Sequence, residues 1–315
     1  MLPLVTVISL TYNNHEKLGF TITSILEQNY PSIQLIISDD ASDNQDFEEI
    51  AKAINDKKRA NIIKVDYLKN ERNIGTVKHA NKALKHAQGE LIKFLSPGDS
   101  FYNPDSLAIL VSELMKSEAS ALIAQTLVSA EMQIPNSITA VNTAMNGILK
   151  YNDYSPGELL ELLLEECFIN TTGSIFRKEI FEKYGLFDES YKLMEDWPTW
   201  IKLIKNGEKI KFIQTVAAVY TLGGLSTAKS ALTDILLSDI HLLYEKEILE
   251  IAAKLPLKKR YGILFLYNRI SAKKSGSLYK KAKFIIKYAP YLLAIRIPKK
   301  IKKKLINATR LTILV

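Results

Sequence analysis

The first hundred residues alternate short apolar runs with longer segments whose apolar residues recur at helical spacing. The runs are continuous and rich in β-branched residues, which predicts strands buried on both faces at Leu4–Leu10, Ile33–Ser38, Ile62–Leu68 and Leu91–Leu95. The segments between them predict helices at His15–Gln28, Gln45–Asn55 and Thr76–His86. Strands and helices that alternate through short loops indicate an α/β fold with a mostly parallel sheet flanked by helices.

The second half of the chain continues the alternation less regularly. Strands are predicted at Ser120–Ser129, Ile169–Phe176 and Lys211–Tyr220, and helices at Pro104–Lys116, Pro156–Glu166, Lys178–Tyr184 and Glu195–Asn206. Residues 130–156 show no clear period, and we interpret them as a variable loop region. From Ala231 the pattern is helical and then basic, with predicted helices over 257–271, 278–288 and 298–311. We therefore predict one domain over residues 1–230 and a helical, basic C-terminal region over 231–315.

Polar residues follow each of the first four predicted strands. Right-handed crossovers place the carboxyl ends of parallel strands at one edge of the sheet, so the loops that follow them should meet there. The residues concerned are Tyr12, Asp39, Asp40, Asn73 and Asp99. Their convergence predicts a ligand site. For Asp99, which directly follows Pro97-Gly98, an ordinary turn is the alternative interpretation.

The composition is that of a globular protein, with 47% hydrophobic and 24% charged residues in 315. The single cysteine, Cys167, excludes an internal disulfide and fits a reducing compartment. Because it follows two glutamates, which raise the pKa of a thiol, we interpret it as a core residue rather than a nucleophile. The four histidines are too scattered for a metal cluster and are interpreted as surface or packing residues.

The apolar N-terminus lacks the basic segment and the cleavage site of a signal peptide, so we interpret it as a first strand. No apolar run approaches the ~20 residues that span a bilayer. We therefore expect a cytoplasmic protein that is soluble or lies on a membrane surface.

Charge is distributed unevenly behind the formal net charge of +8. Of the 42 Lys and Arg, eighteen lie after Glu250, where the sequence has no Asp or Glu. In this basic region, lysines alternate with aliphatic and aromatic residues, which suits the inner face of a cell membrane. Nucleic acid is a less favoured partner, and a solvated basic helix or a subunit contact is the remaining alternative.

Several short motifs, in this order and spacing, resemble the family 2 glycosyltransferases, whose fold is called GT-A. The resemblance runs from about Val5 to Ser226 and rests on Val7-Ile-Ser-Leu-Thr-Tyr-Asn13, Ile36-Ile-Ser-Asp-Asp-Ala-Ser42, Asn73-Ile-Gly75 with Asn81, Gly89-Glu90, Ser96-Pro-Gly-Asp99 and Glu195-Asp-Trp197. It implies a nucleotide-sugar half at about residues 1–118 and an acceptor half at about 119–230.

The resemblance also implies roles for individual residues. Tyr12 would border the nucleotide base, Asp40 would accept a hydrogen bond from a uracil-type base, and Asp39 would support the turn. The wider nucleotide site would comprise Thr11, Tyr12, Asp39, Asp40, Asn73, Ser96 and Gly98. Asp99 would bind a Mg²⁺ or Mn²⁺ ion that bridges the donor diphosphate, and Asp196 would be the catalytic base. The acceptor site would comprise Gly173, Ser174, Glu195 and Trp197.

Elementary chemistry is consistent with these roles. A hard cation on one or two carboxylates neutralises charge on the leaving diphosphate, and a carboxylate opposite the leaving group removes the acceptor proton and gives inversion. For Asp196, an acid favoured by the helix N-terminus is the alternative interpretation. For Gly173 the alternative is close packing. Trp197 and Trp200 are expected to point outward and inward, respectively.

Two features of the sequence depart from the family pattern. Ser96, Pro97 and Gly98 stand where the family usually has further carboxylates of the metal motif, and no histidine follows the last strand of the domain. Ser226 and Thr227 are then candidates for phosphate contacts. We predict an inverting, single-displacement hexosyltransferase that transfers sugar from a nucleotide diphosphate, UDP in the first instance, to a glycan or lipid-linked glycan. The alternative is a catalytically inactive GT-A-like binding or scaffold protein with a degenerate metal site.

Overall fold

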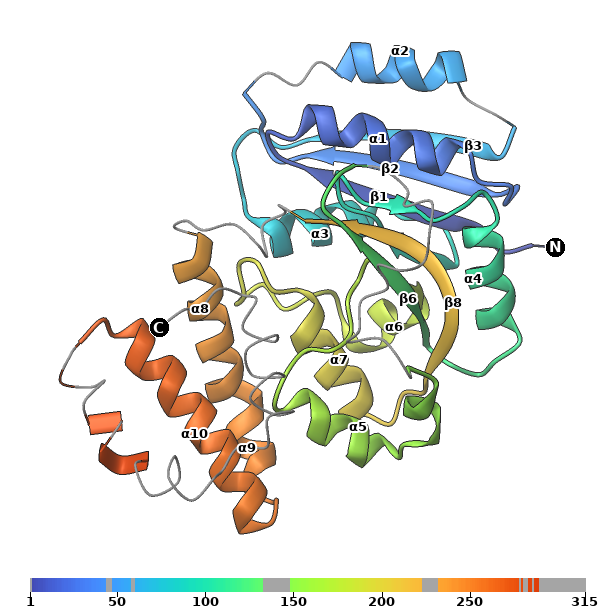
Figure 1. The fold of residues 1–315 in the computed structure, drawn as a ribbon. Helices are drawn as coiled ribbons and strands as arrows, with labels where there is room; N and C mark the ends of the chain where they lie inside the picture. The colour runs from blue at the N-terminus through green and yellow to red at the C-terminus, as the bar shows by residue number, and fades with distance from the viewer. Residues whose placement is uncertain are drawn as a thin grey trace.

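The computed structural model describes residues 2–43, 47–57, 60–132, 148–222, 232–277, 279, 283–284 and 286–288. Within these residues the strands form one eight-stranded sheet in the order β3-β2-β1-β4-β7-β6-β8-β5 (Figure 1). The predicted helix over 298–311, and Ser226 and Thr227, lie outside the described residues.

The first half of the sheet is parallel, as predicted. It contains β1 (Val5–Thr11), β2 (Ile33–Asp39), β3 (Ile62–Lys69) and β4 (Leu91–Phe94). The crossover helices are α1 (His15–Leu26), α2 (Phe47–Lys57) and α3 (Thr76–Lys85). Observed and predicted bounds agree within two residues, because a buried parallel strand and an amphipathic helix each leave a clear pattern in the sequence.

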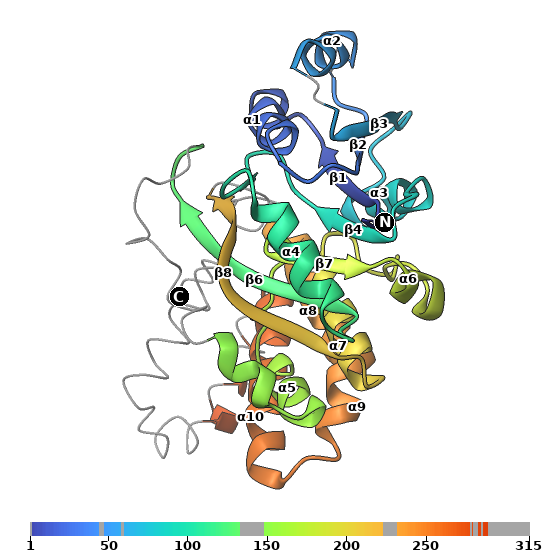
Figure 2. The same cartoon turned by 90° about the vertical axis from the view of Figure 1, so that its right-hand side faces the viewer.

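The second half of the sheet is mixed. Its strands are β5 (Ser100–Phe101), β6 (Ala121–Ser129), β7 (Ser174–Arg177) and β8 (Ile210–Thr221). β7 runs antiparallel to β4 and β6, β5 runs antiparallel to β8, and β6 pairs with β8 in parallel. The helices are α4 (Ser106–Met115), α5 (Pro156–Leu163), α6 (Glu179–Tyr184) and α7 (Asp196–Lys205). Figure 2 shows the strong curvature of β6 and β8, which share two register shifts near Gln125.

Alternate residues of the strands enter two separate cores. On β1, Val5 and Val7 pack with α1 and α4, whereas Ile8 packs on the opposite face with α3. On β7, Ile175 and Phe176 divide in the same way. This arrangement explains why the strand sequences are continuously apolar: both faces of the sheet are covered by helices.

Two elements were not predicted as observed. The predicted strand Ile169–Phe176 begins only at Ser174, because Asn170 Oδ1 accepts the Gly173 N–H and folds the preceding residues into a loop. β5 has two residues, too few to show a period, and it forms only through pairing with β8. The predicted loop region 130–156 includes a 3₁₀ helix at Ile148–Asp153, and residues 133–147 lie outside the described part.

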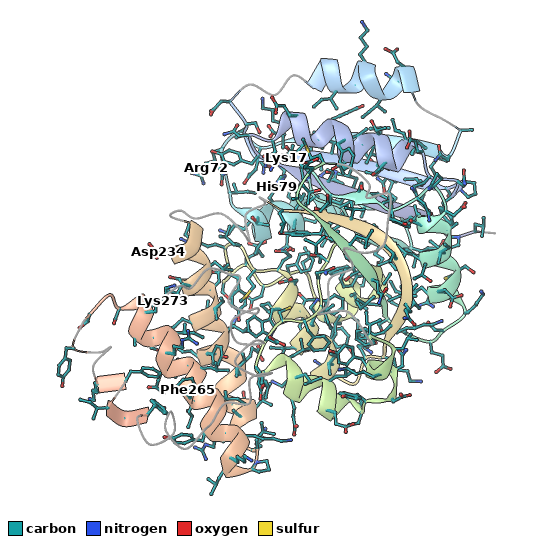
Figure 3. All side chains as sticks on the ribbon, viewed as in Figure 1. Lys17, Arg72, His79, Asp234, Phe265 and Lys273 are labelled. Atoms are coloured by element: carbon teal, nitrogen blue, oxygen red, sulfur yellow. The ribbon has the colours of Figure 1, made fainter. Side chains whose placement is uncertain are left out.

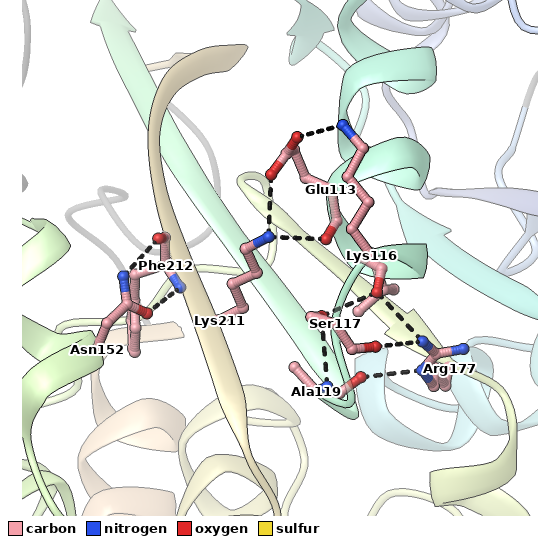
Figure 4. Close-up of polar contacts among 9 residues, drawn as sticks. Glu113, Lys116, Ser117, Ala119, Asn152, Arg177, Lys211 and Phe212 are labelled. Carbon is pink, nitrogen blue, oxygen red and sulfur yellow. Dashed lines mark hydrogen bonds and ion pairs between the residues drawn. The ribbon is translucent and has the colours of Figure 1, made fainter.

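Polar contacts secure the end of β8 that lies farthest from Thr221 (Figure 4). Lys211 Nζ donates to the backbone carbonyl and Oε2 of Glu113 on α4, both at 2.9 Å. Asn152 exchanges two hydrogen bonds with the backbone of Phe212, which ties the 3₁₀ helix to the strand. Arg177 donates to the carbonyls of Ala119, Leu114 and Ser117. These contacts hold the Lys211 end of β8 in place, and the loops of the predicted site lie at the opposite end of the strand.

The C-terminal helices share the core of the sheet. They are α8 (Leu232–Leu243), a π-helical turn (Tyr244–Ile248), α9 (Leu249–Ala252) and α10 (Leu257–Lys274). Leu243 and Tyr244 are buried in the same cluster as Phe176 and Trp200. None of the described helices is long and apolar enough to cross a membrane. These helices lie within the region that was predicted to be helical, and they pack onto the sheet domain.

Candidate functional site

The loops after β1 and β2 are joined by hydrogen bonds at the carboxyl edge of the sheet. The Asp40 N–H donates to the carbonyl of Thr11 at 2.9 Å, and Asn13 N–H donates to Ser42 Oγ at 2.7 Å. Asp39 is fully buried and its carboxylate accepts hydrogen bonds from the N–H and the hydroxyl of Ser42. Asp39 therefore supports the turn, as expected.

Asp40 accepts hydrogen bonds from the loop that follows β3. Its carboxylate is buried and accepts hydrogen bonds from Asn70 Nδ2 at 2.7 Å, from Ile74 N–H at 3.0 Å and from Gly75 N–H at 3.0 Å. A carboxylate has about four acceptor sites, and these donors occupy most of them. The carboxylate thereby closes the 70–75 loop, and its hydrogen bond to a uracil-type base stays a prediction. Gly75 is in a left-handed conformation, with φ of 85°, which favours glycine there.

The other predicted nucleotide residues of this edge differ in exposure. Tyr12 is 45% exposed, and Asn73 is exposed with its Oδ1 accepting the Gly75 N–H. Both stay candidates for a nucleotide contact. Thr11 is only 2% exposed, so its side chain is buried, and its contact with a nucleotide stays a prediction. His79 is also buried, with Nε2 2.7 Å from Ser38 Oγ, and burial lowers its pKa.

Asp99 lies where β4 gives way to β5 and is held by the acceptor half. Its Oδ1 accepts the Thr221 N–H at 3.0 Å and its Oδ2 accepts the Thr172 hydroxyl at 2.8 Å. Burial raises the pKa of Asp99 to about 6, and the two hydrogen bonds and the nearby Lys93 and Lys17 act in the opposite direction. The turn before it is fixed because Gly98 N–H donates to Thr21 Oγ1 and Thr221 Oγ1 donates to the Gly98 carbonyl.

Asp99 is a single carboxylate donor toward a metal ion. Within the described residues, no group of three or more His, Cys, Asp or Glu side chains is arranged to hold one. Each oxygen of Asp99 accepts one protein hydrogen bond and so keeps a further acceptor position. Mg²⁺ commonly uses only one or two carboxylates together with phosphate oxygens and waters, so Asp99 fits such an ion in the presence of a diphosphate. Ser96 is exposed beside it, and Gly98 has φ of 97°.

A buried lysine lies next to this carboxylate. Lys93, in the middle of β4, is fully buried, and its Nζ donates to the carbonyls of Thr172 at 2.6 Å, Phe94 at 2.9 Å and Thr171 at 3.4 Å. Three carbonyl acceptors match the three N–H donors of an ammonium group. Burial lowers the pKa of Lys93 to about 7, and Asp99 raises it. The lysine therefore connects the nucleotide half of the sheet to the 171–172 loop.

Glu195 and Asp196 form a pair of partly buried carboxyl groups at the start of α7. Oδ1 of Asp196 accepts a hydrogen bond from the Trp197 N–H at 2.6 Å. Burial and the neighbouring Asp196 raise the pKa of Glu195 to about 8. Burial also raises the pKa of Asp196. The pair therefore consists of two adjacent carboxyl groups at the N-terminus of α7, each with a raised pKa.

Three residues of the predicted acceptor site are buried or closely packed. Trp197 was expected to point outward, but it is 9% exposed and its Nε1 donates to the Leu163 carbonyl at 2.7 Å; Trp200 points inward as predicted. Gly173 is packed so tightly that a Cβ would lie 2.5 Å from the Ala124 carbonyl. Ser174 is fully buried and its hydroxyl donates to the Asn170 carbonyl at 2.5 Å. The outward orientation of Trp197 was wrong, and all three residues take part in core packing, whereas their place in an acceptor site stays a prediction.

Contacts connect the regions of Asp40, Asp99 and Asp196. The Val77 N–H at the start of α3 donates to the Lys192 carbonyl, close to Asp196 in sequence. On the other side, Thr172 holds Asp99, and Cys167 lies near enough to Asp196 for that carboxyl to raise the pKa of the thiol, after burial as the main cause. Figure 3 labels Lys17 and His79. Lys17 lies near enough to Asp99 to lower the pKa of that carboxyl group, and Asp40 lies near enough to His79 to raise the pKa of the imidazole.

Sequence reasoning missed four residues of this site. Thr172 and Thr221 leave no pattern, because their role is contact with a distant loop. Lys93 could have been found, since a lysine inside the apolar run Leu91–Leu95 needs buried partners. Asp239 could have been found for the same reason, as an acid among apolar residues on the inner side of α8.

Comparison of the sequence with known families gives one clear match. The model described as "Glycosyl transferase family 2" matches residues 6–185. An uncharacterized glycosyltransferase of Rickettsia prowazekii is 28% identical over 203 residues, which is 64% of this chain and 59% of that protein. The chain therefore spans less than two thirds of that relative's length.

Two relatives carry more specific names. A putative teichuronic acid biosynthesis glycosyltransferase, TuaG of Bacillus subtilis, is 28% identical over 65% of this chain and 73% of its own. WfgD of Escherichia coli, a UDP-Glc:alpha-D-GlcNAc-diphosphoundecaprenol beta-1,3-glucosyltransferase, is 26% identical over 64% of this chain and 70% of its own.

Solved structures resemble this fold at low identity. TarS 1-349 of S. aureus in complex with UDP-GlcNAc has a TM-score of 0.56 at 17% identity and covers 92% of each chain. The mannosyltransferase PcManGT from Pyrobaculum calidifontis, in complex with GDP-Man and Mn²⁺, has a TM-score of 0.59 at 16% identity and covers 99% of this chain and 86% of its own. The expected GT-A-type fold is confirmed.

Proposed function

The chain belongs to glycosyltransferase family 2, and from this premise we propose that it is an inverting hexosyltransferase that uses a UDP-linked sugar. Its product would be a surface polysaccharide or glycoconjugate. The names of TuaG and WfgD support this choice of donor and product. The first name refers to teichuronic acid, and the second refers to a UDP donor and a diphosphoundecaprenol-linked acceptor.

The Glu195–Asp196 pair is the observation that carries the proposal. An inverting transfer needs one ionised carboxylate that takes the acceptor proton as the hydroxyl attacks the anomeric carbon. Burial and Asp196 raise the pKa of Glu195 to about 8, so Glu195 holds a proton at neutral pH, and we assign the role of the base to Asp196 of the Glu195-Asp-Trp197 motif. The bond between the anomeric carbon and the phosphate oxygen then breaks, and the nucleoside diphosphate leaves from the opposite face.

The donor would bind along the edge formed by the loops after β1, β3 and β4. Tyr12 and Asn73 offer exposed groups to the nucleoside, whereas Asp39 and Asp40 hold the turns in place. A divalent cation on Asp99, completed by diphosphate oxygens and water, would neutralise the charge that develops on the leaving group. Lys93 holds the Thr172 carbonyl, and the Thr172 hydroxyl orients Asp99 for that role.

Substitution of the two carboxylates tests the proposal. In a UDP-release assay with a panel of UDP-sugars, Asp196→Asn should lower kcat by about 10²-fold or more, because general-base assistance is worth ~10²–10⁴-fold. Donor binding, measured by thermal shift, should persist in Asp196→Asn and weaken in Asp99→Ala. Asp56→Asn, an exposed carboxyl on α2, is the matched control and should behave as wild type. An Asp196→Asn protein with the wild-type rate would contradict the proposal.

A scaffold function is the second candidate, and the single carboxylate of the metal motif favours it. A scaffold would bind nucleotide-sugar in the thermal-shift assay, with or without Mn²⁺, and would show no turnover with any donor. UDP release above background from the wild-type chain, lost in Asp196→Asn, excludes this candidate. The same screen with GDP-sugars tests the choice of nucleotide.

A further inference from the structure

The loop that precedes the Glu195–Asp196 pair is held by a carboxylate from the C-terminal helices. Three successive backbone N–H groups, of Lys192, Leu193 and Met194, donate to one oxygen of Asp239 on α8, at 2.9, 2.7 and 3.2 Å. Asp239 is 4% exposed. It lies beyond residue 185, where the match to the family model ends.

This arrangement fixes the path of the backbone. Successive N–H groups that point to one anion form a concave nest, and hydrogen bonds to a charged acceptor are shorter and stronger than neutral ones. The same segment is held on its other side, because the Lys192 carbonyl accepts the Val77 N–H at 3.2 Å. The backbone at residues 192–194 is therefore tied to both α8 and α3, one residue before Glu195.

Other contacts from the C-terminal helices hold the earlier part of the same loop. Lys246, in the π-helical turn after α8, pairs with Asp188 and donates to Ser190 Oγ at 3.1 Å. Its Nζ also lies 5.6 Å from the centre of the buried Tyr191 ring. From residue 188 to residue 194 the loop thus follows the surface of α8 and the turn after it.

We propose that Asp239 is a positioning residue for the Glu195–Asp196 pair, which makes α8 a part of the catalytic unit. This inference rests on the proposed function. Its physical basis is that a general base must lie within hydrogen-bond distance of the acceptor hydroxyl, and that a displacement of about 1 Å can cost ~10²-fold in rate. Asp196 follows the tethered segment by only two residues, so a looser segment moves the base.

A purely structural role for Asp239 makes a different prediction. Loss of a buried carboxylate that only stabilises the fold would lower the melting temperature and leave kcat per folded molecule unchanged. A positioning role lowers kcat in the folded protein. Donor KM is expected to stay the same, because the hydrogen bonds described for the Asp239 side chain go to residues 192–194 and not to the carboxyl ends of β1, β3 and β4.

The test compares Asp239→Asn with Asp234→Asn in the full-length chain. Both changes remove one carboxylate from α8, and Asp234 is exposed (Figure 3). Asp239→Asn should lower kcat about tenfold or more at an unchanged donor KM, in line with the cost of misplacement. Asp234→Asn should match wild type. If Asp239→Asn does not fold, Asp239→Glu keeps the charge, moves the oxygens by one methylene and is measured in the same way.

Hydrogen exchange provides a readout that does not depend on turnover. In Asp239→Asn the amides of residues 192–194 should exchange faster, while those of β1 and β2 keep the wild-type rate. Unchanged protection at 192–194 overturns the inference, and so does faster exchange with wild-type kcat. If the wild-type chain has no turnover with any donor, the proposed function fails first, and the catalytic part of the inference fails with it.

Discussion

At the scale of single residues, the environment of each carboxyl group decides its role. Asp39 and Asp40 are adjacent in sequence and both buried, yet one closes its own turn and the other closes the 70–75 loop. Asp99 is oriented by two threonines from the acceptor half. Asp196 raises the pKa of Glu195, and this interaction makes a pH dependence testable.

Glu195→Gln should become more stable relative to wild type as pH rises. Burial and Asp196 raise the pKa of Glu195 to about 8 from a usual value of 4.5, so the folded chain holds a proton that the unfolded chain releases. The free energy of unfolding of wild type therefore falls between about pH 4.5 and pH 8, by at most ~1.4 kcal/mol per unit for this group. Gln lacks this dependence.

Thermal denaturation from pH 5 to pH 9 measures the difference between the two proteins. Glu27→Gln, a change at an exposed glutamate after α1, is the control and should keep a constant difference from wild type. A difference between Glu195→Gln and wild type that does not grow with pH would show that Glu195 ionises normally in the folded chain.

At the scale of elements, the functional edge is made by ends of strands that meet through side chains. β4 and the 171–172 loop are distant in sequence. Lys93 on β4 connects them, because its ammonium group donates to the carbonyls of Thr171 and Thr172 as well as to that of Phe94. β8 contributes the Thr221 N–H to Asp99 and the Thr221 hydroxyl to the Gly98 carbonyl. Through these links, both halves of the sheet hold the turn that contains Gly98 and Asp99.

Lys93→Met should destabilise the fold although it replaces a buried charge with an apolar side chain. The carbonyls of Thr171 and Thr172 would lose their donor, and an unsatisfied buried acceptor costs about 1–3 kcal/mol. Loss of the ammonium would also raise the pKa of Asp99 further, because Lys93 lowers it. Chemical denaturation measures the stability, and Lys85→Met, on the exposed side of α3, is the control. Equal stability of Lys93→Met and wild type would refute this role.

At the scale of the whole molecule, an acidic catalytic body is followed by a basic C-terminal region. Its described helices pack into the core beside Trp200, and Leu257 at the start of α10 is 83% exposed. Basic residues after Glu250 continue into residues 289–315, outside the described part. The proposed partner of this region is an anionic membrane that carries the glycan acceptor, which would place the protein on the cytoplasmic face.

Deletion of residues 290–315 should abolish sedimentation with anionic liposomes and leave UDP release from a soluble acceptor unchanged. The physical reason is that each Lys or Arg near an anionic surface contributes about 1 kcal/mol. The full chain with neutral liposomes is the control and should remain in solution. Equal binding of the full and shortened chains to anionic liposomes would exclude this role of the tail.

The sequence alone determined the type and order of most elements, because buried strands and amphipathic helices impose periods that are local. It also determined which loops share the carboxyl edge, since parallel strands joined by crossover connections all end at the same edge of the sheet. The resemblance of short motifs placed the chain in its family before any coordinates were known.

Only the tertiary structure decided what each polar group at that edge does. It shows that Asp40 anchors the 70–75 loop and that Trp197, Gly173 and Ser174 are packed in the interior. Lys93 and Asp239 gained partners that lie far away in sequence. The reason is that hydrogen-bond partners and burial are properties of contacts between distant segments, which leave no period in the chain.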